Sequence, residues 1–137
     1  MDIQELKVEA QLENLSQVIQ FVDRILESAD CPMKAQMQID LAVEEIFVNI
    51  AHYAYAPGKG DVTLRMEITG DPAAAVLVFT DSGVPYNPLV KDDPDISLSA
   101  AQREIGGLGI FMVKKMVDEM SYEFKDGCNV LTIRKKM

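Results

Sequence analysis

The 137-residue chain has no long hydrophobic run and only two cysteines. No apolar run approaches the roughly 20 residues of a membrane-spanning helix, and the first ten residues lack the apolar core of a signal peptide. The cysteines fit no metal-ligand spacing, and isolated thiols without an export signal indicate a reducing compartment. We therefore expect a cytoplasmic protein that is not inserted in a membrane and needs neither disulfides nor a structural metal.

Basic residues are also scarce. The chain has 13 lysines and arginines against 22 aspartates and glutamates, which gives a net charge of −9. Sequence-independent binding to DNA or RNA needs a cationic surface for phosphate contacts, so we expect no direct nucleic-acid partner. The acidic excess would favour a basic protein partner, although many acidic proteins have none.

What the sequence does contain is typical of one globular domain, with 48% hydrophobic and 26% charged residues. Alternating apolar residues predict strands at 2–10, 61–69, 74–80, 121–125 and 129–135. Apolar residues at i, i+3, i+4 spacing predict helices at 12–28, 34–55 and 108–119. This order predicts an α/β (α+β) two-layer sandwich, in which a mixed, mostly antiparallel sheet of about five strands carries the helices on one face.

The predicted helix at 34–55 carries Glu45, Asn49 and His52 on one face, because their spacings of four and three match the helical repeat. A carboxylate and an amide one turn apart could act as a general base and as an oxygen ligand for a hard cation such as Mg²⁺. Alternatively, the two bond to each other or face solvent. A lone histidine such as His52 is more often a packed or capping side chain than a ligand.

A second motif, Asp81-Ser82-Gly83-Val84-Pro85, directly follows a predicted buried strand. The Asp81 carboxylate could accept a hydrogen bond from an exocyclic amine, and Gly83 would let the backbone approach a planar ring. The same residue types are common in turns, so the segment could equally be a simple strand end.

The third motif, Gly106-Gly107-Leu108-Gly109, opens the last predicted helix, where free backbone N–H groups can hold an anion. It has neither the strand that precedes a dinucleotide fingerprint nor the GKS or GKT of a P-loop. The proline-containing, acidic segment before it is long enough to be a functional lid or a disordered stretch. The glycines could also be the hinge of such a lid.

In this order, Glu45 to Asn49, Asp81 to Pro85 and Gly106 to Ile110 resemble the nucleotide-binding boxes of the GHKL (Bergerat-fold) ATPases. That superfamily includes gyrase, histidine kinases and small anti-sigma-factor kinases. The single short domain, the first strand near the start and the sequence AHYAY after the first box most resemble the anti-sigma-factor serine/threonine kinases. The resemblance spans essentially the whole chain and implies that residues 1–137 form one histidine-kinase-like ATPase domain.

The resemblance implies ATP and Mg²⁺ as ligands. It makes Glu45 the catalytic base, Asn49 the Mg²⁺ ligand and Asp81 the acceptor of the adenine amine, with Gly83 under the ring. Phosphate contacts would come from Gly107, Leu108, Gly109 and Arg103, the last of these in an ATP lid at about 86–105. The chain departs from the family in two places: Gly127-Cys128-Asn129 stands where relatives often have Gly-Thr, and Tyr53 stands in the usual place of the box histidine.

The leading hypothesis is an ATP-dependent protein serine/threonine kinase that regulates transcription by partner switching. The resemblance implies that it binds a sigma factor and phosphorylates a small anti-anti-sigma-type antagonist protein, and it is compatible with a homodimer. The rival hypothesis is a catalytically inactive, ATP-gated protein-binding regulator of the same fold. A third is a structural or interaction protein that binds no nucleotide.

Overall fold

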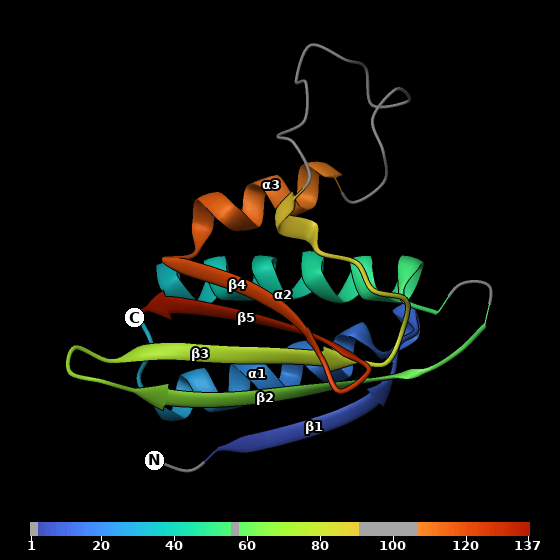
Figure 1. The fold of residues 1–137 in the computed structure, drawn as a ribbon. Helices are drawn as coiled ribbons and strands as arrows, with labels where there is room; N and C mark the ends of the chain where they lie inside the picture. Colours follow the sequence, from blue (N-terminus) through green and yellow to red (C-terminus); the bar gives the residue numbers. More distant parts are fainter. Residues whose placement is uncertain (1–2, 56–57, 91–106) are drawn as a thin grey trace.

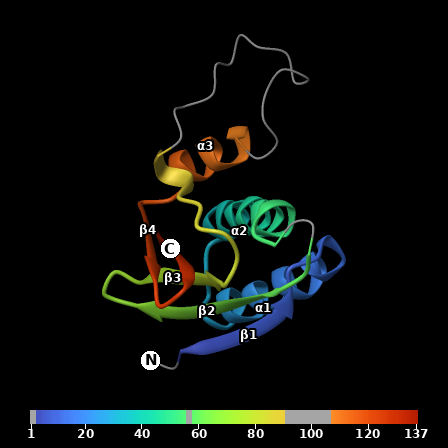
Figure 2. The ribbon, with the colours of Figure 1, turned by 45° about the vertical axis from the view of Figure 1, so that its right-hand side comes forward.

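The computed structural model describes residues 3–55, 58–90 and 107–137, which form two layers (Figure 1). One layer is a five-stranded sheet, and the other contains α1 and α2, with α3 beside α2 (Figure 2). The strands are β1 (Gln4–Glu9), β2 (Asp61–Thr69), β3 (Ala74–Asp81), β4 (Glu119–Lys125) and β5 (Cys128–Lys136). The helices are α1 (Leu15–Ser28), α2 (Met33–Tyr53) and α3 (Gly107–Met116), with 3₁₀ turns at Leu12–Asn14 and Pro88–Val90. The predicted α/β two-layer sandwich is confirmed.

The strands follow the order β1-β2-β3-β5-β4, and each pairing is antiparallel. The last strand along the chain therefore lies inside the sheet, between β3 and β4. In the β3–β5 register, Asp81 pairs with Asn129, which brings the end of β3 to the beginning of β5. This end of the sheet carries the candidate site described below.

The connection between β4 and β5 is a two-residue hairpin turn. Asp126 and Gly127 both have positive φ, 54° and 78°, between the paired residues Lys125 and Cys128. Such turns match the right-handed twist of the flanking strands, and Asp-Gly is among the sequences that adopt them most readily. The hairpin fixes the register of β4 on β5.

The core lies between the sheet and the helices. On β2 the alternation is strict, because every second residue from Val62 to Ile68 is buried while the residues between them are not. The opposite face carries side chains such as Arg65, which forms an exposed 3.5 Å ion pair with Glu5 of β1. The largest fully buried side chains come from both layers and include Leu26, Ile39, Ile46, Phe47, Met66, Leu77, Phe79 and Ile133.

Helix α2 is buried over much of its circumference because α1 and α3 both pack against it. From α3, Ile110 and Val113 are buried. Within the described part of the chain, no helix combines the length and hydropathy that a membrane span requires. α2 is thus a central helix with neighbours on several sides, and a polar side chain on its packed faces, such as Asn49, is largely shielded from water.

The α1–α2 contact includes a polar cluster. The Gln36 amide nitrogen donates to Asp23 Oδ1 and to Glu27 Oε2, at 3.2 Å each. Nearby, burial raises the pKa of Asp40 to about 8, and a hydrogen bond and the charges of Asp23 and Glu27 add to the effect. Asp40 Oδ1 is buried and has no hydrogen-bond partner among the described residues.

Element boundaries differ from the sequence prediction by a few residues. α3 ends at Met116 rather than 119, and β4 begins at Glu119 rather than 121. The cause is tertiary: the Asp118 backbone N–H donates to the Arg134 carbonyl at 2.9 Å, and Asp118 Oδ2 accepts from the Lys136 N–H at 2.6 Å. These bonds attach the chain to β5 directly after the helix. At the other end of the fold, residues 12–14 form a separate 3₁₀ turn before α1.

Candidate functional site

In the described ranges the buried polar side chains are Asn49, Asp81 and Asn129, with exposed fractions of 8%, 6% and 6%. All three line one cavity that is open to solvent. Its wall includes three tyrosines, Tyr53, Tyr86 and Tyr122, together with apolar side chains from α2, β3 and β5. Apolar walls with a few fixed polar groups are typical of small-molecule sites, so this cavity is the candidate ligand pocket.

Helix α2 supplies the first wall of the cavity through Asn49. Its Oδ1 is buried and has no hydrogen-bond partner in the described part of the chain. An unsatisfied buried amide oxygen is costly in a folded protein, and it marks a position that a ligand or cation can satisfy. The alternative in which Asn49 bonds to Glu45 is not among the hydrogen bonds of the described residues.

One turn earlier on α2, Glu45 is partly buried. Burial raises the pKa of its carboxyl group above the ordinary glutamate value, and the charge of Glu44 adds to the effect. The carboxylate lies against the beginning of α3, because a Cβ atom added to Gly109 would stand 2.0 Å from Glu45 Oε2. Two motifs separated by more than sixty residues therefore meet, and glycine at 109 leaves room for the carboxylate.

Asp81 is the last residue of β3 and supplies the second wall. Its Oδ1 accepts two hydrogen bonds at 2.9 Å, from the Gly83 backbone N–H and from the Asn129 amide nitrogen. No donor among the described residues bonds to Oδ2. The carboxylate is thus held by one oxygen, and the other remains available to a ligand.

Residues 82–84 pack on the end of α2. A Cβ atom at Gly83 would lie 2.2 Å from the Ala54 carbonyl oxygen, and the same oxygen accepts from the Val84 N–H at 2.9 Å. Glycine is thus required by close contact with the helix backbone, whatever its relation to a ligand. The Tyr55 hydroxyl accepts from the Ser82 N–H at 2.7 Å and further secures the turn.

Asn129 is the site residue that the sequence analysis did not select. Its amide nitrogen donates to Asp81 Oδ1 at 2.9 Å and to the Val84 carbonyl at 2.8 Å. Its Oδ1 accepts from the Tyr86 N–H at 3.1 Å and from the Tyr122 hydroxyl. The available signal was its place on β5, where residues 129, 131 and 133 are the buried ones and an asparagine is the exception.

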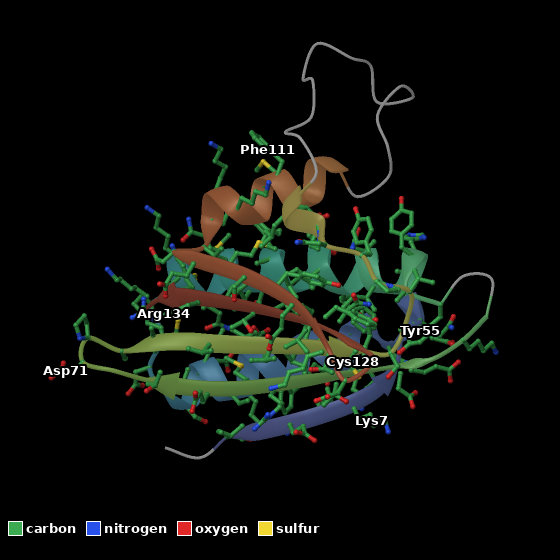
Figure 3. The ribbon with its side chains drawn as sticks, viewed as in Figure 1. Lys7, Tyr55, Asp71, Phe111, Cys128 and Arg134 are labelled. Atoms are coloured by element: carbon green, nitrogen blue, oxygen red, sulfur yellow. The ribbon has the colours of Figure 1, made fainter. Side chains whose placement is uncertain are left out.

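Two tyrosine rings close one side of the cavity. Tyr53 of α2 and Tyr86 stack with ring centroids 6.2 Å apart and an interplanar angle of 18°. Figure 3 places Tyr55 and Cys128 at this end of the sheet and Arg134 at the other. His52, in the last turn of α2, is exposed beside the Tyr53 ring and is not among the cavity-lining residues.

Several predicted site residues cannot be placed in this geometry. Arg103, Gly106 and positions 91–105 of the predicted lid lie outside the described residues. Gly107 and Leu108 form the first turn of α3 together with Gly109, so the glycine-rich motif does open a helix as predicted. Their contacts with phosphate remain predictions.

Comparison with known proteins identifies the family to which the chain is similar. The model of the histidine kinase-like ATPase domain matches residues 8–135, nearly the whole chain. The chain is also similar to the serine/threonine-protein kinase BtrW of Bordetella bronchiseptica, with 24% identity over 100 residues. That alignment covers 73% of this chain and 70% of the relative.

Proposed function

This chain belongs to the family of histidine kinase-like ATPase domains, and we propose that it is an ATP-dependent protein serine/threonine kinase that controls transcription by partner switching. The family implies ATP binding. The proposed protein kinase activity is supported by the similarity to a serine/threonine-protein kinase and by the chemistry of the site. The observation that carries it is the contact of the Glu45 carboxylate with the glycine-rich start of α3, one helical turn from Asn49.

The residues present fit ATP and Mg²⁺. The unsatisfied buried Oδ1 of Asn49 is an oxygen donor of the kind that Mg²⁺ prefers. Asp81 Oδ2 would accept the adenine amine, and the backbone N–H groups of Gly107, Leu108 and Gly109 would hold phosphate at the start of α3. Arg103 would reach the terminal phosphate from the lid. When bound, Mg²⁺ would neutralise charge on the phosphates.

Glu45 would act as the general base for the acceptor protein. The serine or threonine hydroxyl oxygen forms a bond to the terminal phosphorus while the bond from that phosphorus to ADP breaks. The hydroxyl proton passes to the Glu45 carboxylate. A raised pKa makes this carboxylate a stronger base than an ordinary glutamate, and positioning supplies most of the remaining rate.

The proposed partners follow from the resemblance to anti-sigma-factor kinases: a sigma factor, and a small anti-anti-sigma-type antagonist that carries the phosphorylated hydroxyl. A net charge of −9 would favour a partner with a basic contact surface. The proposal places the protein in the cytoplasm, where such partners act, and allows a homodimer.

Replacing Glu45 with alanine tests the kinase assignment. We expect Glu45→Ala to lower phosphate transfer to the acceptor by at least about 100-fold, the usual contribution of a general base, while the Kd for ATP changes little. Transfer is measured with radiolabelled ATP and an acceptor captured from the host, and binding by calorimetry. Glu123→Ala, which removes an exposed glutamate of β4, is the matched control and should change neither quantity.

The outcomes separate the hypotheses. Transfer that survives Glu45→Ala would show that the base is another residue. ATP binding without transfer by the wild-type protein would favour the ATP-gated regulator, in which nucleotide changes partner affinity and no phosphate moves. No heat of binding with ATP and Mg²⁺ would support an interaction protein without nucleotide.

A further inference from the structure

Asn129 uses its full hydrogen-bonding capacity within the protein. A carboxamide offers two N–H donors and an oxygen with two lone pairs, and here all four are engaged. The donors bond to Asp81 and Val84, and the oxygen accepts from Tyr86 and Tyr122. Although Asn129 lines the cavity, it has no group left to offer a ligand.

These four partners come from three parts of the fold. Asp81 ends β3, Val84 and Tyr86 belong to the segment that leaves it, and Tyr122 lies on β4. Asn129 itself stands directly opposite Asp81 in the β3–β5 register. A hydroxyl side chain has one donor and could not join all four groups. The amide is therefore the hub that holds this wall of the cavity together.

The same network determines which oxygen of Asp81 faces a ligand. The Gly83 N–H and the Asn129 amide both bond to Oδ1, at 2.9 Å. These two donors fix the plane of the carboxylate, and Oδ2 has no donor within residues 3–55, 58–90 and 107–137. Without Asn129, only the Gly83 N–H would restrain the carboxylate, which could then rotate about its Cβ–Cγ bond.

We propose that Asn129 is a positioning residue that orients the Asp81 carboxylate and thereby gives the pocket its preference for purines with a 6-amino group. The inference rests on the proposed ATP site and extends it to a residue that does not touch the ligand. A fixed acceptor at Oδ2 suits an amine, which donates, and disfavours a 6-oxo or unsubstituted purine, which cannot donate there.

The test compares ATP with purine riboside triphosphate, which lacks the 6-amino group, by calorimetry on the wild-type protein and on Asn129→Leu. We expect the wild-type protein to bind ATP more tightly than the analogue. Asn129→Leu should weaken ATP by about 10-fold or more, as expected when a hydrogen bond to a charged group is lost, and should change the affinity for the analogue less than about twofold.

A second variant keeps the test conclusive if the first one fails to fold. Asn129→Ala removes both donors with a smaller side chain and adds no charge beside Asp81, so the same selective loss for ATP is expected. Circular dichroism and thermal melts check that each variant is folded. Thr132→Val is the matched control, because Thr132 lies on the same strand and borders a different surface pocket, and it should leave both affinities unchanged.

Each other outcome has a distinct meaning. Equal weakening of ATP and the analogue in folded variants would make Asn129 a structural residue only and overturn the inference. Unchanged ATP affinity in Asn129→Leu and Asn129→Ala would overturn it as well. If the wild-type protein bound neither nucleotide, the proposed ATP site itself would be wrong.

Discussion

Glu44 and Glu45 are adjacent acidic residues on α2, and the charge of the first adds to burial in raising the pKa of the second. A carboxylate with a raised pKa becomes an active base only at higher pH. Glu44→Gln removes one of the two causes, so we expect the pKa of Glu45 to fall and the acid limb of the transfer rate to move to lower pH. At a pH within that limb, the variant should be faster than the wild-type protein.

The pKa of Glu45 can be measured directly by NMR titration of its side-chain carboxyl carbon, which needs no acceptor protein. Glu123→Gln is the control, since its side chain is exposed and belongs to β4. An unchanged Glu45 titration in Glu44→Gln would mean that burial alone sets the value. If the pH–rate profile of Glu44→Gln shifts while the NMR titration of Glu45 stays the same, the acid limb belongs to another group.

At the residue scale, sequence reasoning found the side chains with unusual chemistry for their position. Glu45, Asn49 and Asp81 are polar residues in apolar surroundings, and such residues are visible in a pattern. Asn129 was noticed only as a departure from the Gly-Thr of relatives. Its importance depends on the β3–β5 register, which places it opposite Asp81, and no local pattern encodes which two strands of a sheet pair.

At the scale of elements, the α1–α2 contact has its own response to pH. Asp40 has a pKa of about 8 in the folded protein against an ordinary 3.8. Between these values the folded state binds more protons than the unfolded chain, so the free energy of unfolding falls as pH rises from about 4 to about 8. The stabilising effect of the protonated Asp40 is complete below about pH 4 and lost above about pH 8.

Asp40→Asn removes this titration while keeping the size of the side chain. We expect the variant to gain stability relative to the wild-type protein as pH rises, with a larger gain at about pH 8 than at about pH 5. Urea unfolding at both pH values measures the difference. The control is Glu13→Gln, which replaces an exposed carboxylate in the 3₁₀ turn. It should change the free energy of unfolding by the same amount at both pH values. A constant difference between Asp40→Asn and the wild-type protein would contradict the prediction.

The elements themselves were largely predictable because their signals are local. Alternation identifies β2, and the Asp126-Gly127 turn identifies the last hairpin. The ends of α3 and β4 were misplaced because Asp118 bonds to Arg134 and Lys136 of β5, and these contacts are tertiary. Helix boundaries depend on such partners more than on the residues inside the helix.

At the scale of the whole molecule, a ligand that binds only the folded state raises the unfolding temperature. The pocket unites α2, β3, β4 and β5, so it exists only when these elements are assembled. At about 100 times its Kd, ATP with Mg²⁺ should add about 2.7 kcal/mol of stability and raise Tm by about 10 °C. Differential scanning calorimetry with and without nucleotide measures the shift.

The comparison of ATP with GTP tests whether the Tm shift depends on the 6-amino group. GTP at the same concentration should raise Tm much less, because its 6-oxo group cannot donate to Asp81. Asp81→Asn should lose most of the ATP effect, since the Gly83 and Asn129 donors would hold the amide oxygen and leave its NH₂ group, a donor, facing the adenine amine. Equal shifts with ATP and GTP would argue against a purine-selective pocket, and no shift with either would argue against nucleotide binding.

The position of β5 within the sheet has a consequence for synthesis on the ribosome. Until residues 128–136 have left the exit tunnel, β3 has no partner on its inner side, and β4 has no strand to pair with. A shorter nascent chain therefore presents an open strand edge, the kind of surface that chaperones cover and that aggregates readily. Because Asn129 lies in this strand, the nascent chain cannot complete its nucleotide pocket before then, and nucleotide binding would mark the molecules in which β5 has joined the sheet.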